Sequence, residues 1–123
     1  FATIQKVYES EVTSLFNALD KIELSLEGKT YLVGAKLTLA DIRLFVTLIR
    51  FDAVYFNHFK TNRQHIYEYT NLWNFVKLLY NNEKVRPTVK FDEIKDHYFK
   101  THPFINPSGI VPVGPSIIER LIP

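Results

Sequence analysis

The fold of this protein is decided by the stretch LTLADIRLFVTLIRF, residues 37–51. Thr38 is of a residue type that begins helices, because its hydroxyl can accept a hydrogen bond from a backbone N–H one turn later. Asp41 can reach back to the N–H of Thr38, which makes the two residues a capping box. Leu37 and Ile42 occupy the two positions of a hydrophobic staple. These four residues predict the start of a helix.

The helix that follows is apolar around most of its circumference. Its polar interruptions are Arg43, Thr47, Arg50 and Asp52. A helix of this kind is surrounded by other helices and does not lie on a surface. We therefore expect residues 38–54 to form the central helix of an all-α domain.

Helical periodicity also marks the segments 3–26, 70–80 and 88–100. Gly28 is the expected stop of the first segment and Thr70 the expected N-cap of the second. Residues 55–69 lack a clean period and are expected to form a mixed loop, which leaves room for a short helical turn. A short final helical turn is expected over residues 117–121.

The last part of the chain differs in character from the rest. Residues 101–123 contain four interrupting prolines at 103, 107, 112 and 115, so no long helix can form there. We expect an ordered tail packed on the bundle through its apolar residues, which are Phe104, Ile105, Ile110, Val111 and Val113. The expected organisation is one domain over residues 1–123, with a helical bundle over 1–100 and a Pro/Gly-rich tail over 101–123.

Size and composition exclude several classes of function. A chain of 123 residues with 46% hydrophobic residues can bury a core. Its formal charge of +2 does not indicate nucleic-acid binding, and no apolar run is long enough to span a membrane. The sequence contains no cysteine, so this chain supplies no disulfide, thiolate metal site or thiol nucleophile.

The four histidines do not form a recognisable metal site. No two of His58, His65, His97 and His102 stand at positions i and i+4 of one helix, the spacing of a helical metal pair. We interpret them as surface or helix-end residues and expect no metal. No Ser-His-Asp arrangement can be deduced either.

Charged residues interrupt the central helix and need partners there. We expect Asp41 and Asp52 to cap neighbouring loops or to form internal ion pairs. In the alternative interpretation, Arg43 and Arg50 face another domain. Trp73 lies on an apolar stripe and is expected in the core or at an interface.

Two motifs of this sequence lie close together, YLVG at residues 31–34 and LTLAD at 37–41. In these motifs the sequence resembles the C-terminal helical domain of glutathione transferases. Four further motifs are more specific: ADIRLF at 40–45, IRFDAVY at 49–55 with HFK at 58–60, HYF at 97–99 with His102, and INPSGIVPVGP at 105–115. In these the sequence resembles the Xi class, the glutathionyl-hydroquinone reductases.

The resemblance implies a longer protein and a thiol mechanism. An N-terminal thioredoxin-like domain, outside this chain, would bind glutathione and present a cysteine. Its thiolate would attack the sulfur of a glutathionyl-hydroquinone, and a second glutathione would resolve the mixed disulfide. Tyr98 aligns with a tyrosine near the quinol oxygen, and His97 and Tyr55 are further candidates for binding the aromatic substrate. Phe99 replaces a more usual second tyrosine. A cytoplasmic homodimer is expected.

The chain begins at Phe1 and contains no methionine, so we expect it to be a fragment, and without a cysteine we expect it to be catalytically inactive alone.

Two alternatives to the reductase interpretation remain open. A transferase-like helical domain can instead serve as a protein-interaction module, as in some translation factors and synthetases. A helical bundle with no ligand is the third possibility.

Overall fold

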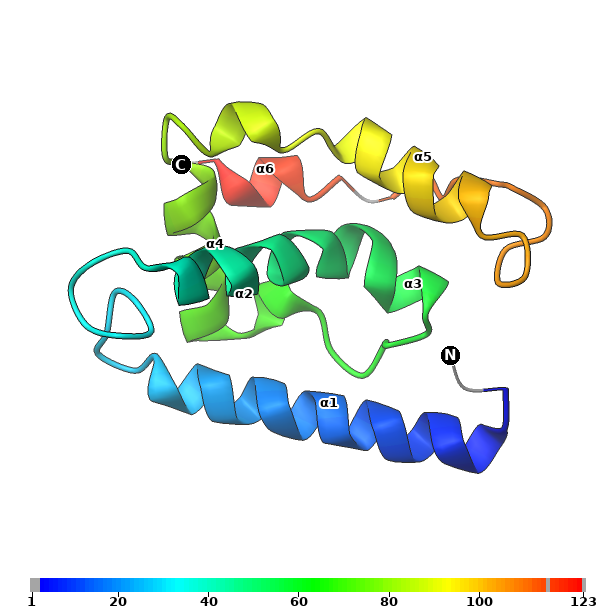
Figure 1. Ribbon diagram of the computed structural model, residues 1–123, viewed down its shortest axis with the longest axis horizontal. Helices are drawn as coiled ribbons and strands as arrows, with labels where there is room; N and C mark the ends of the chain where they lie inside the picture. The colour runs from blue at the N-terminus through cyan, green and yellow to red at the C-terminus, as the bar shows by residue number, and fades with distance from the viewer. Residues whose placement is uncertain (1–2, 115, 123) are drawn as a thin grey trace.

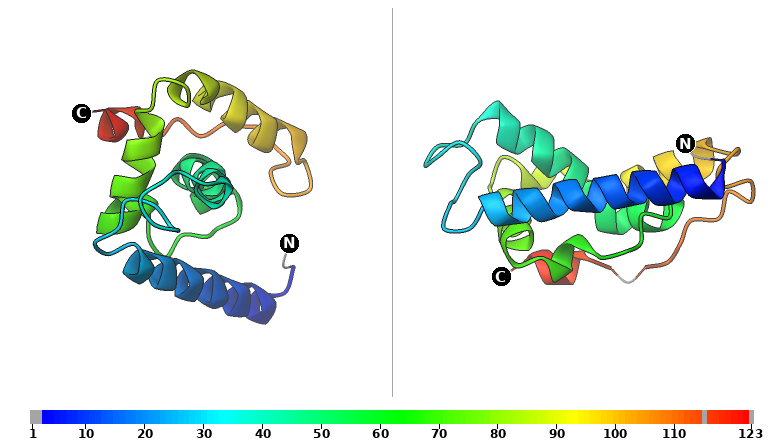
Figure 2. Two further views of the ribbon diagram at one scale, coloured as in Figure 1. Left: turned by 60° about the vertical axis from the view of Figure 1, so that its left-hand side comes forward. Right: turned by 90° about the horizontal axis from the view of Figure 1, so that it is seen from below.

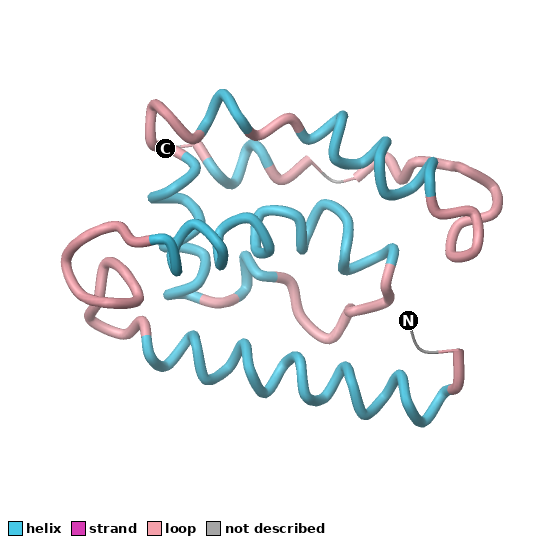
Figure 3. The backbone as a smooth tube through the Cα atoms, in the orientation of Figure 1, coloured by secondary structure: helices cyan, strands magenta, loops and turns pink. Residues whose placement is uncertain are grey.

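The computed structural model describes residues 3–114 and 116–122, in which the regular elements are helices joined by loops (Figures 1 and 3). The long elements are α1 (Gln5–Ser25), α2 (Leu39–Arg50), α4 (Thr70–Tyr80) and α5 (Phe91–Thr101). The short ones are the π-helical turn η1 (Phe51–Tyr55), α3 (Phe56–His58), the 3-10 turns η2 (Ile66–Glu68) and η3 (Arg86–Thr88), and α6 (Ile118–Leu121). The prediction of an all-α domain is confirmed. Pro115, which belongs to the expected tail motif, lies outside the described residues.

Helix α2 lies at the centre of the molecule. Figure 2 (left) shows it nearly end-on, with α1, α4 and α5 arranged around it. The capping box at its start is present: Asp41 Oδ2 accepts hydrogen bonds from the Thr38 backbone N–H (2.8 Å) and the Thr38 hydroxyl (3.2 Å). Asp41 Oδ1 accepts another from the Leu32 N–H (2.9 Å), so this buried carboxylate also closes the preceding loop, as expected. The staple contact of Leu37 stays a prediction.

The central helix is longer than expected. Helical structure runs from Leu39 through η1 and α3 to His58, where the sequence predicts an end near Val54. The extension includes a widened turn, in which the Phe56 N–H donates to the carbonyl oxygen of Phe51, five residues earlier. The loop that was predicted for residues 55–69 begins only after His58, and it ends in η2.

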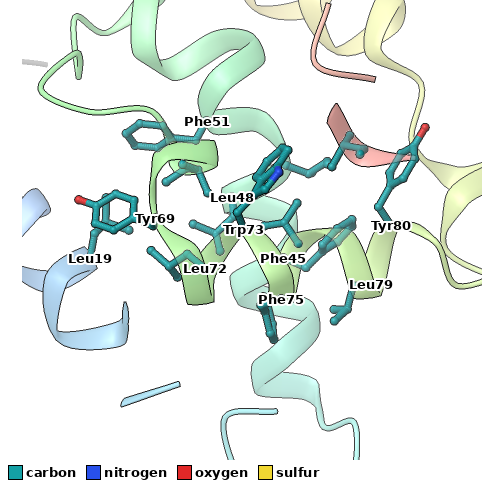
Figure 4. Packing of buried hydrophobic residues seen from close by; sticks show 14 of the residues in the cluster. Leu19, Phe45, Leu48, Phe51, Tyr69, Leu72, Trp73, Phe75, Leu79 and Tyr80 are labelled. Atoms are coloured by element: carbon teal, nitrogen blue, oxygen red, sulfur yellow. The ribbon is translucent and has the colours of Figure 1, made fainter. Parts of the chain in front are cut away.

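The core fills the space between α1, α2 and α4 (Figure 4). Its fully buried side chains include Phe16 of α1, Leu48 of α2 and Leu72 of α4. Trp73 is 9% exposed and belongs to this core, which confirms its expected place. These apolar side chains are removed from water only when all three helices are packed against one another.

Helix α4 begins differently from the prediction. Thr70 is its first residue and not its N-cap. The cap comes from α1: Glu23 accepts hydrogen bonds from the backbone N–H groups of Asn71 (2.9 Å) and Leu72 (2.7 Å). A distant carboxylate therefore satisfies the free N–H groups that a local threonine was expected to satisfy.

Helix α5 starts at Phe91, after the turn η3, and not at residue 88. The tail then runs back from the end of α5 to α6, which lies beside α4 (Figure 1). Asn81 fixes α6 by donating to the carbonyl oxygen of Leu121 (2.8 Å).

The tail contacts the bundle through fewer residues than expected. Ile105 and Val111 are half-buried, and Ile117 and Leu121 are buried. The prediction was wrong for Phe104, Ile110 and Val113, which are exposed, Val113 to 99%. The prolines prevent a long helix here, so the apolar side chains do not share one helical face and only some reach the bundle.

Candidate functional site

Tyr55 and Tyr98 meet where the end of the central helix contacts α5. Their hydroxyl oxygens are 3.3 Å apart, and their rings are T-shaped with centroids 5.6 Å apart. Both side chains are half-buried. Burial, together with the hydrogen bond to Tyr98, raises the pKa of Tyr55 above its usual value of 10.0. Tyr55 therefore stays a neutral phenol at neutral pH.

The chemistry of this pair follows from its single hydrogen bond. When one of two hydroxyl groups donates to the other, the accepting group keeps its own hydrogen. That hydrogen can be donated to a third oxygen atom, such as one on a bound ligand. The tyrosine pair thus provides a positioned hydrogen-bond donor.

The widened turn η1 places Tyr55 at this contact. Phe51 and Phe59 pack edge-on or tilted against the Tyr55 ring, with centroids 6.3 Å and 5.4 Å away. The Thr61 hydroxyl donates to the carbonyl oxygen of Tyr55 (2.7 Å), which ties the following loop to the turn. The surroundings of the pair are therefore mainly aromatic. A π-helical turn of this kind is common at functional sites.

His97, the third predicted site residue, is exposed next to Tyr98. Its ring centroid lies 5.1 Å from that of Tyr98. The structure thus brings Tyr55, Tyr98 and His97 into one area of the surface, with His97 on its solvent side. Their roles toward a substrate stay predictions.

A second polar pair lies one helical turn farther along. His58 Nε2 and His102 Nδ1 are 3.1 Å apart, and the two rings are stacked with centroids 5.3 Å apart. His58 is 4% exposed and ends α3, so it is one of the expected helix-end residues and not a surface residue. Burial first, then the charges of His102 and Lys60, lower the pKa of His58 below its usual 6.5. Sequence reasoning missed this pair because the two residues are 44 positions apart.

Asp52 holds the loop that follows α3. Its carboxylate accepts hydrogen bonds from the backbone N–H groups of Ile66 (2.7 Å) and Tyr67 (3.1 Å), and His65 Nδ1 lies 3.3 Å away. The His65 ring is stacked between Phe56 and Tyr67. Burial raises the pKa of Asp52, against the opposing effect of these N–H donors. The predicted capping role of Asp52 is confirmed.

The tyrosine pair does not line either of the two cavities beside His58. A cavity of about 600 Å³ opens between η1, α3, α5 and the tail, and its lining includes Asp52, His58, His65 and Lys95. A groove of about 570 Å³ lies between α1 and the loop after α3, lined partly by His58 and Phe104. Neither lining includes Tyr55, Tyr98 or His97, within the part of the chain that the structure describes. The pair belongs to an outer surface that this chain does not enclose.

Within residues 3–114 and 116–122, no three His, Asp or Glu side chains are grouped so that they could hold a metal ion. Over the same residues, no helix combines the length and the apolar character needed to cross a membrane.

Comparison with known proteins gives consistent matches. Residues 5–77 match the model of the family described as glutathione S-transferase, C-terminal domain. The glutathionyl-hydroquinone reductase PcpF of Sphingobium chlorophenolicum is 51% identical over 116 residues, which are 94% of this chain and 37% of that protein. The chain therefore spans little more than a third of the length of this relative.

Solved structures agree with the sequence comparison. A putative glutathione S-transferase from Corynebacterium glutamicum superposes with a TM-score of 0.96 at 44% identity, covering 100% of this chain and 41% of that one. The glutathione-bound structure of YqjG, a glutathione transferase homolog from Escherichia coli K-12, gives a TM-score of 0.91 at 45% identity and covers 94% and 38% of the two chains. These relatives confirm the resemblance and the fold predicted from the sequence motifs.

Proposed function

Because this chain belongs to the glutathione S-transferase family, as a C-terminal domain with Xi-class relatives, we propose that it forms the helical part of a glutathionyl-hydroquinone reductase. The observation that carries the proposal is the hydrogen-bonded pair of Tyr55 and Tyr98 on a surface that this chain leaves open. A phenol donor set among aromatic rings suits a substrate that is itself an aromatic ring with oxygen atoms.

The remaining parts of the site would come from another domain. The sequence contains no cysteine, and the chain spans 37% of its relative PcpF. We assign the nucleophilic thiolate to an N-terminal thioredoxin-like domain that closes over the tyrosine pair. Glutathione, a charged tripeptide, would bind mainly to that domain, because the surroundings of the pair are mostly aromatic. A cytoplasmic homodimer is part of the same proposal.

The proposed reaction has two balanced steps. The thiolate attacks the glutathione sulfur of a glutathionyl-hydroquinone, the carbon–sulfur bond breaks, and the ring carbon takes up a proton. The products are the free hydroquinone and a mixed disulfide between enzyme and glutathione. A second glutathione then reduces that disulfide and leaves as glutathione disulfide.

Tyr98 would act on the oxygen of the departing ring. Its hydroxyl donates a hydrogen bond to the quinol oxygen, while Tyr55 fixes its orientation through the 3.3 Å contact. His97 would contribute to the solvent-side wall next to Tyr98. Residues 1–123 alone, which contain no thiol, would not catalyse the reaction.

The test is kinetic and uses the full-length protein. With a glutathionyl-hydroquinone as substrate and glutathione as reductant, Tyr98→Phe should lower kcat/KM by about 100-fold, the typical value of one positioned proton donor. Tyr55→Phe should lower it less. Tyr31→Phe is the matched control, because Tyr31 lies in the loop at the opposite end of α2. Unchanged kcat/KM in Tyr98→Phe, or no turnover by the unaltered protein, would refute the proposal.

A further inference from the structure

Two contacts join the end of the central helix to the end of α5. Tyr55 and His58 are three residues apart on the η1–α3 segment, and Tyr98 and His102 are four residues apart at the end of α5. Residues at the first spacing lie on the same face of a helix, and His102 directly follows α5 as its C-cap residue. The hydroxyl contact of Tyr55 with Tyr98 and the imidazole contact of His58 with His102 therefore lie one after the other where the η1–α3 segment meets the end of α5.

The histidine contact also holds the turn that follows α5. The carbonyl oxygen of His102 accepts hydrogen bonds from the N–H groups of Ile105 (3.0 Å) and Asn106 (2.8 Å). The Asn106 side chain donates to the carbonyl oxygens of Phe99 (2.7 Å) and Ile110 (3.0 Å). The turn of residues 102–106 thus forms one hydrogen-bonded unit with the end of α5. The bond from His102 to His58 connects this unit to α3, beside the edge-on contacts of the His58 ring with Tyr98 and Phe99.

A hydrogen bond between two imidazoles depends on their protonation. One nitrogen must carry the hydrogen and the other must offer a lone pair. The first proton that the pair takes up leaves the bond in place, since a charged N–H can still donate to the remaining lone pair. A second proton removes that lone pair and places two positive charges side by side, one of them on a buried ring.

The charges with the strongest effect on His58 oppose the uptake of a further proton. Titratable and charged groups from four elements line the two cavities beside His58. They are Tyr8 and Glu11 of α1, Asp52 of η1, Lys60 and His65 of the loop that follows α3, and Asp92 and Lys95 of α5. His97 and Tyr98 add to these from α5, and Tyr55 from η1. The charges that act most strongly on His58 are those of His102 and Lys60, and both disfavour its protonation.

We propose that His58 and His102 are positioning residues, which hold Tyr98 against Tyr55 as long as the pair carries at most one proton at their contact. A second proton at the contact releases the end of α5 and the turn 102–106 from α3. Tyr98 then loses its fixed orientation. The consequence for turnover rests on the proposed function, whereas the release itself does not.

The structural test follows Tyr98 directly. The full-length protein is labelled with fluorotyrosine, the Tyr98 signal is assigned with Tyr98→Phe, and its fluorine resonance is recorded as the pH is lowered. We expect the Tyr98 signal to shift with a midpoint below pH 6.5, the usual pKa of histidine. A Tyr98 signal that does not change with pH would overturn the proposal.

Two substitutions of His102 separate the role of the bond from that of the proton. His102→Asn places an amide near the position of Nδ1, so it can keep the hydrogen bond to His58 without titrating, and the shift of Tyr98 should disappear. His102→Ala removes the bond, and Tyr98 should show the released signal at every pH. Lys100→Ala, at an exposed position of α5, should behave like the unaltered protein. A pH-dependent shift that persists in His102→Asn would contradict the proposal, even if His102→Ala fails to fold.

Kinetics gives the functional outcome. In the unaltered protein, kcat/KM for the glutathionyl-hydroquinone should fall about 10-fold to 100-fold as the Tyr98 signal shifts, because a displaced catalytic group loses its productive geometry. His102→Asn should lack this acid limb. If the protein shows no reductase activity but the fluorine shift occurs as expected, the proposed function fails and the positioning role of the histidines stands.

Discussion

Glu23 Oε1 lies 2.7 Å from the backbone nitrogen of Leu72, so a side chain of α1 caps the start of α4. The other carboxylate oxygen accepts from the Asn71 N–H, and the Asn71 side chain donates back to the carbonyl oxygen of Glu23. These three bonds connect two helices at the edge of the core. They also replace the local cap that α4 lacks.

Removing this carboxylate should destabilise the fold. Glu23→Ala leaves two N–H groups of α4 without their acceptor, and we expect the free energy of unfolding to fall by about 2 kcal/mol. The measurement is chemical denaturation at neutral pH. Glu27→Ala, at an exposed position just after α1, is the control and should change stability by less than about 0.5 kcal/mol. Equal effects of the two substitutions would show that Glu23 is not a cap.

Asp52 should matter more, because its carboxylate is 1% exposed. Asp52→Ala leaves the buried N–H groups of Ile66 and Tyr67 without an acceptor and should cost about 3 kcal/mol of unfolding free energy. Asp52→Asn keeps one acceptor oxygen and should cost less. Asp92→Ala, at an exposed position in the first turn of α5, serves as the control. A cost for Asp52→Ala no larger than for Asp92→Ala would contradict the assigned role.

Tyr69 should make the protein less stable in alkaline solution. Burial and the neighbouring Asp20, which accepts the hydrogen bond of the Tyr69 hydroxyl (3.2 Å), raise the pKa of Tyr69 from 10.0 to about 12. The folded state therefore holds this proton more tightly than the unfolded state does. The contribution to stability is complete below pH 10 and is lost as the pH rises to about 12.

Denaturation at a series of alkaline pH values measures this effect. Tyr69→Phe should reduce the loss of stability above pH 10, because the titrating group is gone. Asp20→Asn removes the nearby negative charge and should move the loss to lower pH. The same alkaline loss in the unaltered protein and in Tyr69→Phe would show that other groups cause it.

Asn81 should hold α6 on the bundle. Its side-chain amide donates to the carbonyl oxygens of Lys77 and Leu121, both at 2.8 Å. Asn81→Ala should speed hydrogen exchange at residues 118–122 about 5-fold, the equivalent of about 1 kcal/mol for one hydrogen bond. Asn74→Ala, at an exposed position of α4, should leave that exchange unchanged. Unaltered exchange in Asn81→Ala would mean that apolar contacts alone hold α6.

Much of the helical framework could be predicted from the sequence. Periodic apolar residues located α1, α4 and α5, and the spacing of Thr38 and Asp41 located the start of α2. These signals are local, since a helix repeats every 3.6 residues and its caps lie within one turn. The family resemblance also depended only on the order of residues, and it singled out Tyr98.

Contacts between distant residues were decided only by the tertiary structure. No local sequence signal predicts the widened turn at Phe51–Tyr55. Whether the backbone there forms α-helical or π-helical hydrogen bonds follows from packing against η2 and α5. Glu23 caps a helix 48 residues away, and His58 meets His102 across 44 residues. The sequence by itself thus determined which segments are helical and which family they resemble. Packing determined which side chains meet, because such contacts depend on how whole helices lie against one another and not on neighbours along the chain.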